Sequence, residues 1–596
     1  MSTGHIHFVS LGVKSTSRML LLIIIIANRQ ATTEDITFTD VTDEAGIEFA
    51  LIPPDDSMFP NGHFFGGVGL ADFDGNGAVD IYFSGGGGDH DTLYLNDGTG
   101  HFTDASQAWG LDARDLSCGV GAGDLDNDGW IDIVVASAGD PDVPGGQPGN
   151  YRLYKNIEGT RFEDVATQAG VHNVSPGSIQ HPTFATPGDF NADGLLDLLY
   201  GSWQVGAEGN RLYTNDGDGT FTDVTKAMGF KQELHLARSF SVNVTDMDGD
   251  LHPDITWVAD FNQSRYFRNN GDGSFSNIGQ TNGTCQDQTA MGSAILDFNK
   301  DGQLDWFVSA IWYHEDDRAY NGNAMYMQIA EHEFVNIAAP LAIHDSGWSW
   351  SSVAADLDQD GLQEIVVGNG SRYPDFINES EYIFKQHDLN GAFYNVTSMT
   401  GLDLACEATS VAAFDMEGDG DLDLVFVCNK SRARLYRNDS VEKGSWLQIS
   451  LGGDPANRIP NNGFNTRVEV QIGNDVQTRY MDGKPSYGAS GPQTLHFGLG
   501  SNEEIDRITV RWINGQVSRL DNVRANQLIH VDPPGSFAQV DLDADGQVGG
   551  SDLLILLSSW GLCEGGNGSC PADFNLDGEV SGFDLSTLLG HWTDSP

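Results

Sequence analysis

Carboxylate and amide side chains recur at fixed spacing in seven short loops of this chain. In each loop the ligand-type residues stand at positions 1, 3, 5 and 9, and six of the seven loops have glycine at position 6. Such alternating oxygen ligands, with a backbone carbonyl at position 7, can surround Ca²⁺, a hard cation that takes about six to eight oxygens. The predicted sets are Asp72, Asp74, Asn76 and Asp80; Asp124, Asp126, Asp128 and Asp132; Asp189, Asn191, Asp193 and Asp197; Asp246, Asp248, Asp250 and Asp254; Asp297, Asn299, Asp301 and Asp305; Asp356, Asp358, Asp360 and Glu364; and Asp415, Glu417, Asp419 and Asp423.

Two further loops near the C-terminus carry related chemistry in a different frame. Their last acid stands at position 12, and an apolar, helix-like run follows each loop. The predicted ligands are Asp541, Asp543, Asp545 and Asp552 in the first loop, and Asp573, Asn575, Asp577 and Asp584 in the second. A loop with this spacing followed by a helix is typical of calcium-binding EF-hands. The sequence therefore predicts up to nine Ca²⁺ sites and no other cofactor.

The seven loops differ in how well they fit an ion. Without a cation, three or four carboxylates would repel one another across a few ångströms. For one loop alone a solvated Asp-Gly hairpin is an equal alternative, but seven loops in register favour metal. We expect a distorted backbone and weaker or displaced binding in the fourth loop, which has Leu251 at position 6 and Pro253 at position 8. The longer side chains of Glu364 and Glu417 have the same expected effect in the sixth and seventh loops.

The overall composition excludes several classes of protein. The 30 basic and 86 acidic residues give a net charge of 30 − 86 = −56. Nucleic acid is therefore not an expected partner, because phosphate binding needs clustered Lys and Arg. The 39% hydrophobic residues suffice for large cores, and the 73 glycines argue against a mainly helical chain.

Short apolar segments flank every acidic loop and indicate β-strands. Small residues precede the loops, β-branched and aromatic residues follow them, and most repeats continue with two more strand-like segments. The first residues of successive loops are 52, 65, 57, 51, 59 and 59 positions apart. Four strands in each of seven repeats predict a mainly β fold, a seven-bladed β-propeller over residues 35–443.

The strand order of the repeats is offset by one. The pattern of the fourth strand begins at Phe38, before the first acidic loop, and no copy follows the seventh loop. We therefore expect residues 38–47 to supply the missing strand of the last blade, near residues 423–438, and to close the ring.

Three smaller units follow the repeats. Residues 445–532 alternate polar and apolar side chains with a period of two, which predicts a small β-sandwich or barrel. Residues 533–538 have the composition of a linker. Residues 539–592, with the two C-terminal loops, are expected to form a small α-helical domain.

The N-terminal segment has the features of a secretory signal. Lys14 and Arg18 precede an apolar run from Met19 to Ala27, which is too short to span a bilayer. We expect residues 1–33 to be a signal peptide and its flank, and the protein to be secreted or at the cell surface without a transmembrane anchor. A buried strand is the alternative for this run.

Six cysteines are compatible with export. Cys406 with Cys428, and Cys563 with Cys570, are candidate disulfide pairs. Cys118 and Cys285 have no evident partner, and no cysteine spacing indicates zinc or redox chemistry.

The motifs resemble three known families. The acidic loops with flanks such as GVGLA before Asp72 and LYLN at 93–96 resemble the FG-GAP/VCBS repeats of integrin-α-like seven-bladed propellers. The segments RVEV, LHFGLG and VRWINGQ resemble the ASPIC/UnbV domain, and the paired loop–helix units resemble a dockerin. The first resemblance implies calcium ions that stiffen blade hairpins, and the last implies a cohesin-like or other protein partner for residues 539–592. A calcium-stabilised helical hairpin without a partner is the alternative for this tail.

Three functions remain open on the sequence. We favour a secreted, calcium-binding, non-catalytic recognition or adhesion protein whose propeller binds a glycan or protein and whose tail anchors it to an extracellular assembly. A component of polysaccharide breakdown, either a glycoside hydrolase or its carrier, is the second. Integrin-like cell adhesion is the third. No catalytic motif or residue can be named, because the chain lacks a G-x-S-x-G or H-E-x-x-H pattern.

Overall fold

The computed structural model describes residues 36–592 with internal gaps. The gaps are residues 53–65, 87–89, 112–113, 139–150, 173–180, 204–208, 316–317, 372, 378, 387–388, 390, 405, 441–443, 544–547, 564–569 and 575–578. The predicted signal segment, residues 1–33, and the predicted ligands Asp545, Asn575 and Asp577 lie outside the described residues. Among the described residues, no helix has both the length and the apolar character needed to cross a bilayer.

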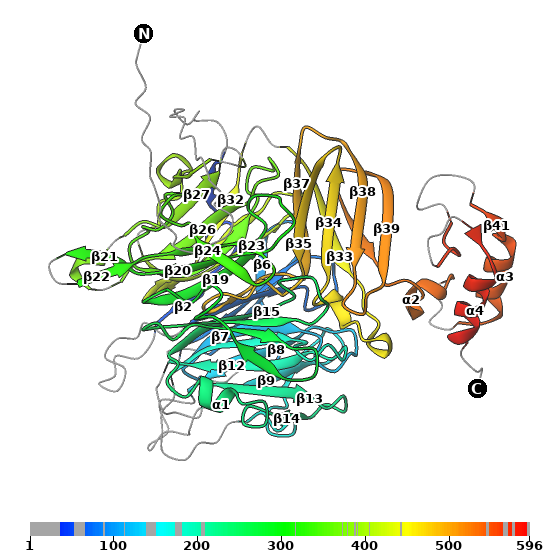
Figure 1. Cartoon of the computed structure of the whole chain (residues 1–596), viewed down its shortest axis with the longest axis horizontal. Coiled ribbons are helices and arrows are strands. Elements are labelled where there is room, and N and C mark those ends of the chain that lie inside the picture. Colours follow the sequence, from blue (N-terminus) through cyan, green and yellow to red (C-terminus); the bar gives the residue numbers. More distant parts are fainter. Residues whose placement is uncertain are drawn as a thin grey trace, which may run out of the picture.

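The fold is mainly β, as the sequence predicts, and each acidic loop belongs to its own antiparallel sheet (Figure 1). Sheets 1 to 3 contain β3 (Gly67–Ala71), β4 (Asp80–Ser84), β5 (Thr92–Asn96) and β6 (Phe102–Asp104); β7 (Ser117–Gly123), β8 (Asp132–Ser137), β9 (Arg152–Asn156) and β10 (Phe162–Asp164); and β11 (Pro182–Gly188), β12 (Asp197–Ser202), β13 (Arg211–Asn215) and β14 (Phe221–Asp223). Sheets 4 to 6 contain β15 (Ser239–Thr245), β16 (Asp254–Ala259), β17 (Arg265–Asn269) and β18 (Phe275–Asn277); β19 (Ala290–Leu296), β20 (Asp305–Ala310), β23 (Ala324–Ala330) and β24 (Glu333–Asn336); and β25 (Ser349–Ala355), β26 (Glu364–Asn369), β27 (Tyr382–Gln386) and β28 (Phe393–Asn395). In every sheet the acidic loop joins the first strand to the second.

Short elements decorate these sheets. A hairpin of β21 (Trp312–Glu315) and β22 (Arg318–Asn321) extends from sheet 5 at the left of Figure 1. The short helices of the repeat region are α1 (Phe230–Glu233) between sheets 3 and 4, η1 (Pro374–Phe376) between β26 and β27 of sheet 6, and η2 (Thr397–Met399) between sheets 6 and 7.

Sheet 7 combines both ends of the repeat region. It contains β29 (Glu407–Phe414), β30 (Asp423–Asn429), β32 (Arg434–Asn438) and β1 (Phe38–Asp40), with β2 (Ala50–Leu51) and β31 (Ser431–Arg432) added. Phe38 faces Asn438 and Asp40 faces Tyr436 in an antiparallel pair. The sequence predicts that residues 38–47 supply the missing strand of the last blade, and β1 occupies that place in sheet 7. The first strands contact one another from β3 through β7, β11, β15, β19 and β25 to β29, which contacts β3 again.

Small residues in the first strands allow this close approach. A Cβ atom on Gly119 of β7 would lie 2.2 Å from Cα of Phe184 in β11, and one on Gly67 of β3 would lie 2.4 Å from the carbonyl oxygen of Cys118. Side chains larger than hydrogen do not fit at these points. The GVG patterns before the acidic loops therefore reflect backbone packing between neighbouring first strands.

Buried apolar clusters join each sheet to the next. One cluster brings Phe83 of sheet 1 against Val425 of sheet 7, and another brings Tyr82 of sheet 1 against Ile133 of sheet 2. All four side chains are at most 1% exposed. Every sheet shares a buried apolar cluster with each of its two neighbours, so its stability depends on theirs.

The second domain (residues 445–531) consists of two sheets, as its alternating pattern predicts. One contains β37 (Thr494–Gly500), β33 (Ser445–Leu451) and β40 (Gln527–Val531); the other contains β35 (Asp475–Tyr480), β34 (Arg467–Ile472), β38 (Glu504–Arg511) and β39 (Val517–Arg524). The turns η3 (Pro455–Asn457) and η4 (Asn461–Gly463) lie between β33 and β34. Apolar side chains of both sheets, such as Phe497 and Val510, form one core.

One segment of the second domain lies among the first strands of the repeats. This central segment (residues 482–493) contains β36 (Ala489–Ser490), which pairs in parallel with β3. The Ser486 hydroxyl accepts hydrogen bonds from the backbone N–H groups of Ser293 in sheet 5 (3.3 Å) and Ser352 in sheet 6 (3.0 Å). Tyr487 is completely buried and stacks on Trp350. The central segment therefore fills space that the first strands surround.

The tail (residues 537–592) is small, helical and set apart from the sheets (Figure 1). It contains α2 (Phe537–Val540), α3 (Gly550–Ser558), β41 (Gly561–Leu562), β42 (Glu579–Val580) and α4 (Gly582–Gly590). The core consists of a few side chains, among them Val548, Leu556, Phe574 and Leu588.

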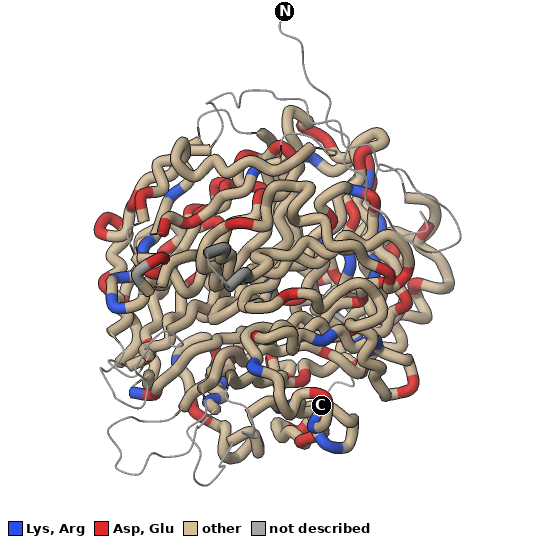
Figure 2. Tube along the Cα trace, turned by 60° about the vertical axis from the view of Figure 1, so that its left-hand side comes forward, with Lys and Arg blue, Asp and Glu red and all other residues tan. Residues whose placement is uncertain are grey.

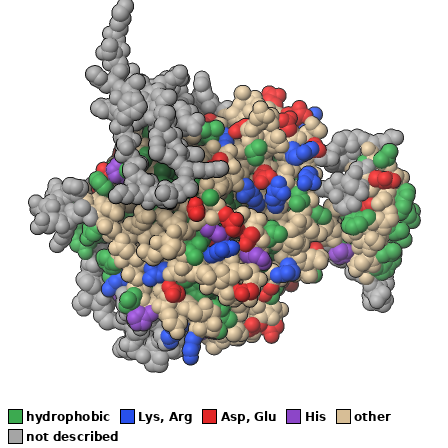
Figure 3. All heavy atoms as spheres, viewed as in Figure 1, with side chains coloured by type: hydrophobic (Ala, Val, Ile, Leu, Met, Phe, Trp, Pro, Cys, Tyr) green, Lys and Arg blue, Asp and Glu red, His purple; other side chains and the backbone are tan. Residues whose placement is uncertain are grey.

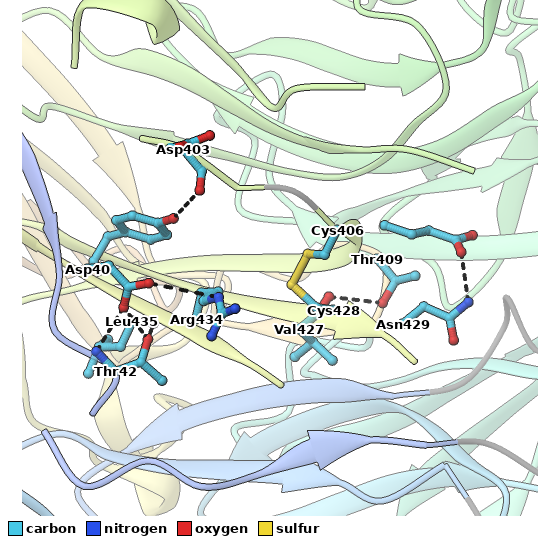
Figure 4. Close-up of a disulfide and its surroundings, with 12 residues drawn as sticks. Asp40, Thr42, Asp403, Cys406, Thr409, Val427, Cys428, Asn429, Arg434 and Leu435 are labelled. Atoms are coloured by element: carbon cyan, nitrogen blue, oxygen red, sulfur yellow. Dashed lines mark hydrogen bonds and ion pairs between the residues drawn. A yellow bond between two sulfur atoms is a disulfide. The ribbon is translucent and has the colours of Figure 1, made fainter. Parts of the chain in front are cut away.

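Both candidate disulfides are present. Cys406–Cys428 joins the start of sheet 7 to its second strand, close to the hydrogen bond from the Thr409 hydroxyl to the Val427 carbonyl (Figure 4). Cys563–Cys570 lies in the tail. Cys118 and Cys285 are buried free thiols.

Candidate metal centres

The position-9 acid of each repeat is fixed by the strand that it begins. Asp80 is fully buried; its Oδ2 accepts a hydrogen bond from the Phe73 backbone N–H and its Oδ1 accepts one from the Asn96 N–H, both at 2.8 Å. The carboxylate therefore connects its own loop to the third strand of the sheet. The corresponding acids, each at most 1% exposed, are Asp132, Asp197, Asp254, Asp305, Glu364 and Asp423.

The position-1 acid holds the loop itself. In the first loop, Asp72 accepts hydrogen bonds from the backbone N–H groups of Asn76 (3.1 Å) and Gly77 (2.8 Å). Gly77 has a φ of 89°, in the left-handed region that the predicted sharp turn at position 6 requires. We call the residues at positions 1, 3, 5 and 9 of repeats 1 to 7 nests 1 to 7.

The fourth loop keeps this geometry, contrary to expectation. Leu251 adopts a φ of 69°, and its N–H donates to Oδ2 of Asp246 at 2.9 Å. The hydrogen bonds of the loop therefore hold a leucine in the left-handed conformation that glycine adopts elsewhere. Such a conformation costs about 1 kcal/mol or more for a residue with a Cβ atom.

The nests bring their carboxylates close enough to share one cation. Oxygen atoms of Asp72, Asp74 and Asp80 lie within 4.8 Å of one another. The same holds for Asp124, Asp126 and Asp132; for Asp246, Asp248 and Asp250; and for Asp356, Asp358 and Asp360. These are oxygen donors of the kind that Ca²⁺ prefers. The residues present therefore fit the predicted ion.

Burial opposes the charged form of these carboxylates. Burial raises the pKa of Asp80 to about 7 and that of Asp254 to about 8. Burial and then the neighbouring Asp360 and Asp358 raise the pKa of Asp356 to about 7. Without a counter-charge, the nests bear an electrostatic cost at neutral pH that a divalent cation would remove.

Some buried oxygens of the nests lack a hydrogen-bond donor among the described residues. Oδ2 of Asp305 in nest 5 and Oδ1 of Asp356 in nest 6 are two such atoms. A buried oxygen without a donor costs about 1–3 kcal/mol unless an ion or water satisfies it. This is an independent reason to place a ligand in the nests.

The second domain covers the nests, which the sequence does not reveal. The Asn461 amide donates to Oδ2 of Asp124 (2.6 Å), and the Gln448 amide donates to Oδ2 of Asp415 (2.8 Å). The Gly498 backbone N–H donates to Oδ2 of Asp356 (3.0 Å). These donors meet position-1 acids of nests 2, 7 and 6, so the nest-bearing ends of the sheets form the interface between the two domains.

Basic side chains also enter several nests. Nε2 of His332, from the turn after β23, lies 2.9 Å from Oδ2 of Asp248 in nest 4. The ammonium groups of Lys155 and Lys385 contact nests 2 and 6. His332 comes from the next repeat, and the lysines stand on third strands, so the spacing within a loop holds no signal for them.

The tail uses its position-12 acids as helix caps. Oδ1 of Asp584 accepts from the Phe574 N–H and its Oδ2 from the Ser581 N–H, both at 2.8 Å. Oδ1 of Asp552 accepts from the Leu542 N–H and its Oδ2 from the Gly549 N–H, both at 2.7 Å. Each acid is therefore the third residue of a helix and accepts from the backbone N–H of the N-cap residue. In α4, where the N-cap is Ser581, this forms a capping box; in α3 the N-cap is Gly549, which has no side chain.

Comparison with known proteins identifies both β regions. Residues 66–135, 189–257 and 246–308 match a model of the FG-GAP-like repeat, and residues 456–536 match the model named ASPIC and UnbV. The chain contains FG-GAP-like repeats and an ASPIC/UnbV domain. The second domain described above is hereafter the ASPIC/UnbV domain.

Curated relatives match this chain at low sequence identity. Cartilage acidic protein 1 of Homo sapiens is 26% identical over 272 residues, which are 44% of this chain and 39% of the human protein. The Mus musculus protein of the same name is 23% identical over 506 residues, 80% of this chain and 74% of the mouse protein. The match to the human protein therefore covers well under half of that protein's length.

Solved structures give weaker matches. A lectin of Agrocybe aegerita that recognises terminal N-acetylglucosamine has a TM-score of 0.35 and 17% identity, over 56% of this chain and 79% of the lectin. A rhamnogalacturonan lyase has a TM-score of 0.34 and 14% identity, over 63% of this chain and 73% of the lyase. At these TM-scores the two structures add nothing about this chain.

Proposed function

We propose that this is a secreted, non-catalytic recognition protein built on a closed seven-bladed propeller that Ca²⁺ stabilises. The propeller binds a glycan at the end opposite the ASPIC/UnbV domain, and the dockerin-like tail binds a second protein. The observation that carries the proposal is the coverage of the nests: because the ASPIC/UnbV domain occupies that end of the sheets, a ligand must bind elsewhere.

The opposite end of the sheets presents aromatic side chains. Acidic loops join first to second strands, so the connections from second to third strands lie at the other end of each sheet. These connections, and the residues just before first strands, contribute the aromatic face: Trp203, Phe261, Tyr313, Trp348 and Tyr373. Trp348 and Tyr373 stack with ring centroids 5.1 Å apart, and Tyr373 is 44% exposed.

Polar and charged groups stand among these rings. The Arg238 guanidinium lies 4.1 Å from the Trp203 ring centroid, and the Trp203 indole N–H donates to Oδ2 of Asp260 at 2.8 Å. Oε2 of Glu379 accepts from the Trp348 N–H at 2.8 Å. Aromatic surfaces combined with a few fixed polar groups are typical of small-ligand sites, and they suit the apolar faces and hydroxyl groups of a sugar ring.

Glycan-array binding tests this proposal with the full chain. Wild type should bind a defined class of glycan, and Trp348→Ala or Tyr373→Ala should weaken that binding at least about tenfold, or 1.4 kcal/mol. Trp560→Ala, in the tail, is the matched control and should leave glycan binding unchanged. A chain that binds no glycan, or whose binding survives both aromatic substitutions, refutes the aromatic face as the site.

The tail carries an exposed apolar surface (Figure 3). Hydrophobic side chains gather along its outer edge in that view, and the exposed residues are Leu554, Leu557, Trp560, Leu562, Phe583, Leu589 and Trp592. Leu562 is 79% exposed and Leu554 69%. So many exposed apolar groups on a unit of this size favour a protein partner over a solitary helical hairpin.

A panel of purified cohesin domains tests this part of the proposal. The full chain should bind at least one with a Kd in the micromolar range or below in Ca²⁺, and Leu562→Ser should weaken that complex about tenfold or more. Trp348→Ala is the control here. Absence of binding to every cohesin would refute the dockerin-like assignment of residues 539–592.

Export is supported by independent observations. The chain forms two disulfides, which persist in oxidising compartments. It is related to cartilage acidic protein 1, which together with the FG-GAP-like repeats favours an extracellular, adhesion-type role. Figure 2 shows how far acidic residues outnumber basic ones along the chain, which favours solubility and opposes binding to anionic surfaces.

A further inference from the structure

Two of the seven nests hold a lysine ammonium that the chain itself supplies. In nest 6 the Lys385 ammonium contacts Asp358 and lies 3.4 Å from Oδ2 of Asp360 and 3.7 Å from Oε1 of Glu364. It therefore approaches the predicted ligands at positions 3, 5 and 9 together. The Lys385 side chain is only 5% exposed.

Nest 2 repeats the arrangement nearer the surface. The Lys155 ammonium contacts Asp126 at position 3 and lies 2.9 Å from Oδ2 of Asp128 at position 5. The Lys155 side chain is 31% exposed. Both lysines occupy the second-last residue of a third strand, β9 or β27, so the same strand position aims its side chain at the nest in both sheets.

The equivalent residue precedes the one whose backbone N–H donates to the position-9 acid. It is Leu95, Thr214 and Met327 in repeats 1, 3 and 5, and none of these side chains can neutralise a carboxylate. Repeats 4 and 7 have Arg268 and Arg437 there, and Nε of Arg437 lies 3.9 Å from Oε1 of Glu417 in nest 7. Nests 1, 3 and 5 therefore have no cation from this position.

We propose that nests 2 and 6 are neutralised by Lys155 and Lys385 and bind no Ca²⁺, whereas nests 1, 3 and 5 depend on the ion. This inference rests on the proposed calcium function. An ammonium within about 4 Å of the ligand oxygens repels a divalent cation, and moving Lys385 aside would leave its charge unpaired in a buried environment. A lysine at this strand position thus excludes the ion from its nest.

Counting bound Ca²⁺ tests the proposal on the full chain. Equilibrium dialysis with radioactive Ca²⁺ should find at most seven ions per chain, two fewer than the nine predicted loops provide. Lys385→Met and Lys155→Leu should each gain one ion. The reverse change, Met327→Lys, should lose one, because it places an ammonium in nest 5.

Thermal unfolding in EDTA supplies a second readout. The EDTA-induced fall in Tm should grow in Lys385→Met and shrink in Met327→Lys, relative to wild type. If Lys385→Met does not fold, Lys155→Leu and Met327→Lys carry the same test.

The outcomes separate this inference from the function on which it rests. Nine ions in wild type, or a count that none of the three substitutions changes, overturns the assignment of nests 2 and 6 while the calcium function stands. Oδ1 of Asp356 in nest 6 also has no donor among the described residues, and an ion bound there beside Lys385 would raise the wild-type count and overturn the assignment. Absence of Ca²⁺ from every variant refutes the calcium function itself.

Discussion

The acidic loops of the repeats and those of the tail use similar residues but are supported differently. In the repeats, the last acid begins a strand, and backbone N–H groups of its own loop and of the third strand hold its carboxylate. In the tail, the last acid is the third residue of a helix, and it caps that helix in a unit with a small core. The ASPIC/UnbV domain donates to acids of several nests, and the described tail loops have no comparable cover.

We infer from this difference that ligand spacing alone would not set how much a loop depends on a bound ion. A nest in the repeats keeps its shape through sheet pairing and apolar clusters on both sides. A tail loop has fewer buried contacts to replace the ion. We therefore expect metal removal, a change of pH and substitution of an acid to affect the repeats and the tail to different extents.

Chelation should have the largest effect and should separate the regions. In excess EDTA at neutral pH we expect residues 539–592 to lose protection from hydrogen exchange throughout, while the strands of sheets 1 to 7 keep most of theirs and unfold at a lower Tm. Hydrogen-exchange mass spectrometry of the full chain measures both. Equal loss of protection in the two regions would contradict the comparison, and an unchanged Tm would contradict calcium binding altogether.

The pH dependence of the metal-free protein should be the next largest effect. Raised pKa values, about 7 for Asp80 and about 8 for Asp254, mean that the folded state binds protons more tightly than the unfolded chain. The resulting stabilisation is complete below the unfolded pKa, about 4, and is lost as the pH rises through these folded values. In EDTA the Tm of the repeats should therefore be higher at about pH 5 than at about pH 8.

Saturating Ca²⁺ is the control for the pH experiment. The ion favours ionised carboxylates, so it should reduce or reverse the difference between the two pH values. A metal-free Tm that falls on acidification from about pH 8 to about pH 5 would show that the position-9 acids are not the controlling groups.

Substitution of a position-9 acid should destabilise the repeats strongly. Asp197→Ala removes the acceptor of the Phe190 N–H and the Asn215 N–H, both buried. We expect a loss of about 2–5 kcal/mol in the free energy of unfolding, since each unsatisfied group costs about 1–3 kcal/mol. Urea denaturation measures it. Glu163→Ala, at an exposed site in sheet 2, should cost less than about 0.5 kcal/mol.

Substitution of a position-12 acid should cost less and act locally. Asp584→Ala removes the capping box of α4, for which we expect about 1–2 kcal/mol in the local stability of the tail. Hydrogen exchange of residues 582–590 measures it, with the exposed Ser586→Ala as control. A loss larger than that of Asp197→Ala would reverse the order of dependence argued here.

Local patterns in the sequence predict most of the fold and the nests. The nests are predictable because their ligands lie within nine residues and repeat with the strands around them. The pairing of Phe38 with Asn438 is also predictable, since one fourth-strand pattern precedes the first loop and none follows the last. Both arguments use order along the chain.

Other features depend on residues distant in the sequence. His332 reaches nest 4 from the following repeat, and Asn461 reaches nest 2 from another domain. Lys155 stands on a third strand, where its neighbours resemble those of Thr214 in the next repeat. Leu251 shows the converse: its residue type predicts a distorted turn, but the hydrogen bonds of the loop impose the common geometry. Tertiary contacts decide these cases, and no local pattern records them.

The central segment has a consequence for biogenesis. Ser486 and Tyr487 contact several first strands at once, although they are encoded after all of them. A ribosome must therefore release nearly five hundred residues (Ser490 is the last of β36) before the interior of the repeat region can reach its final packing. Until then the nascent repeats would expose backbone groups that the late segment later satisfies, so chaperone contact during export is expected to concentrate on this interval.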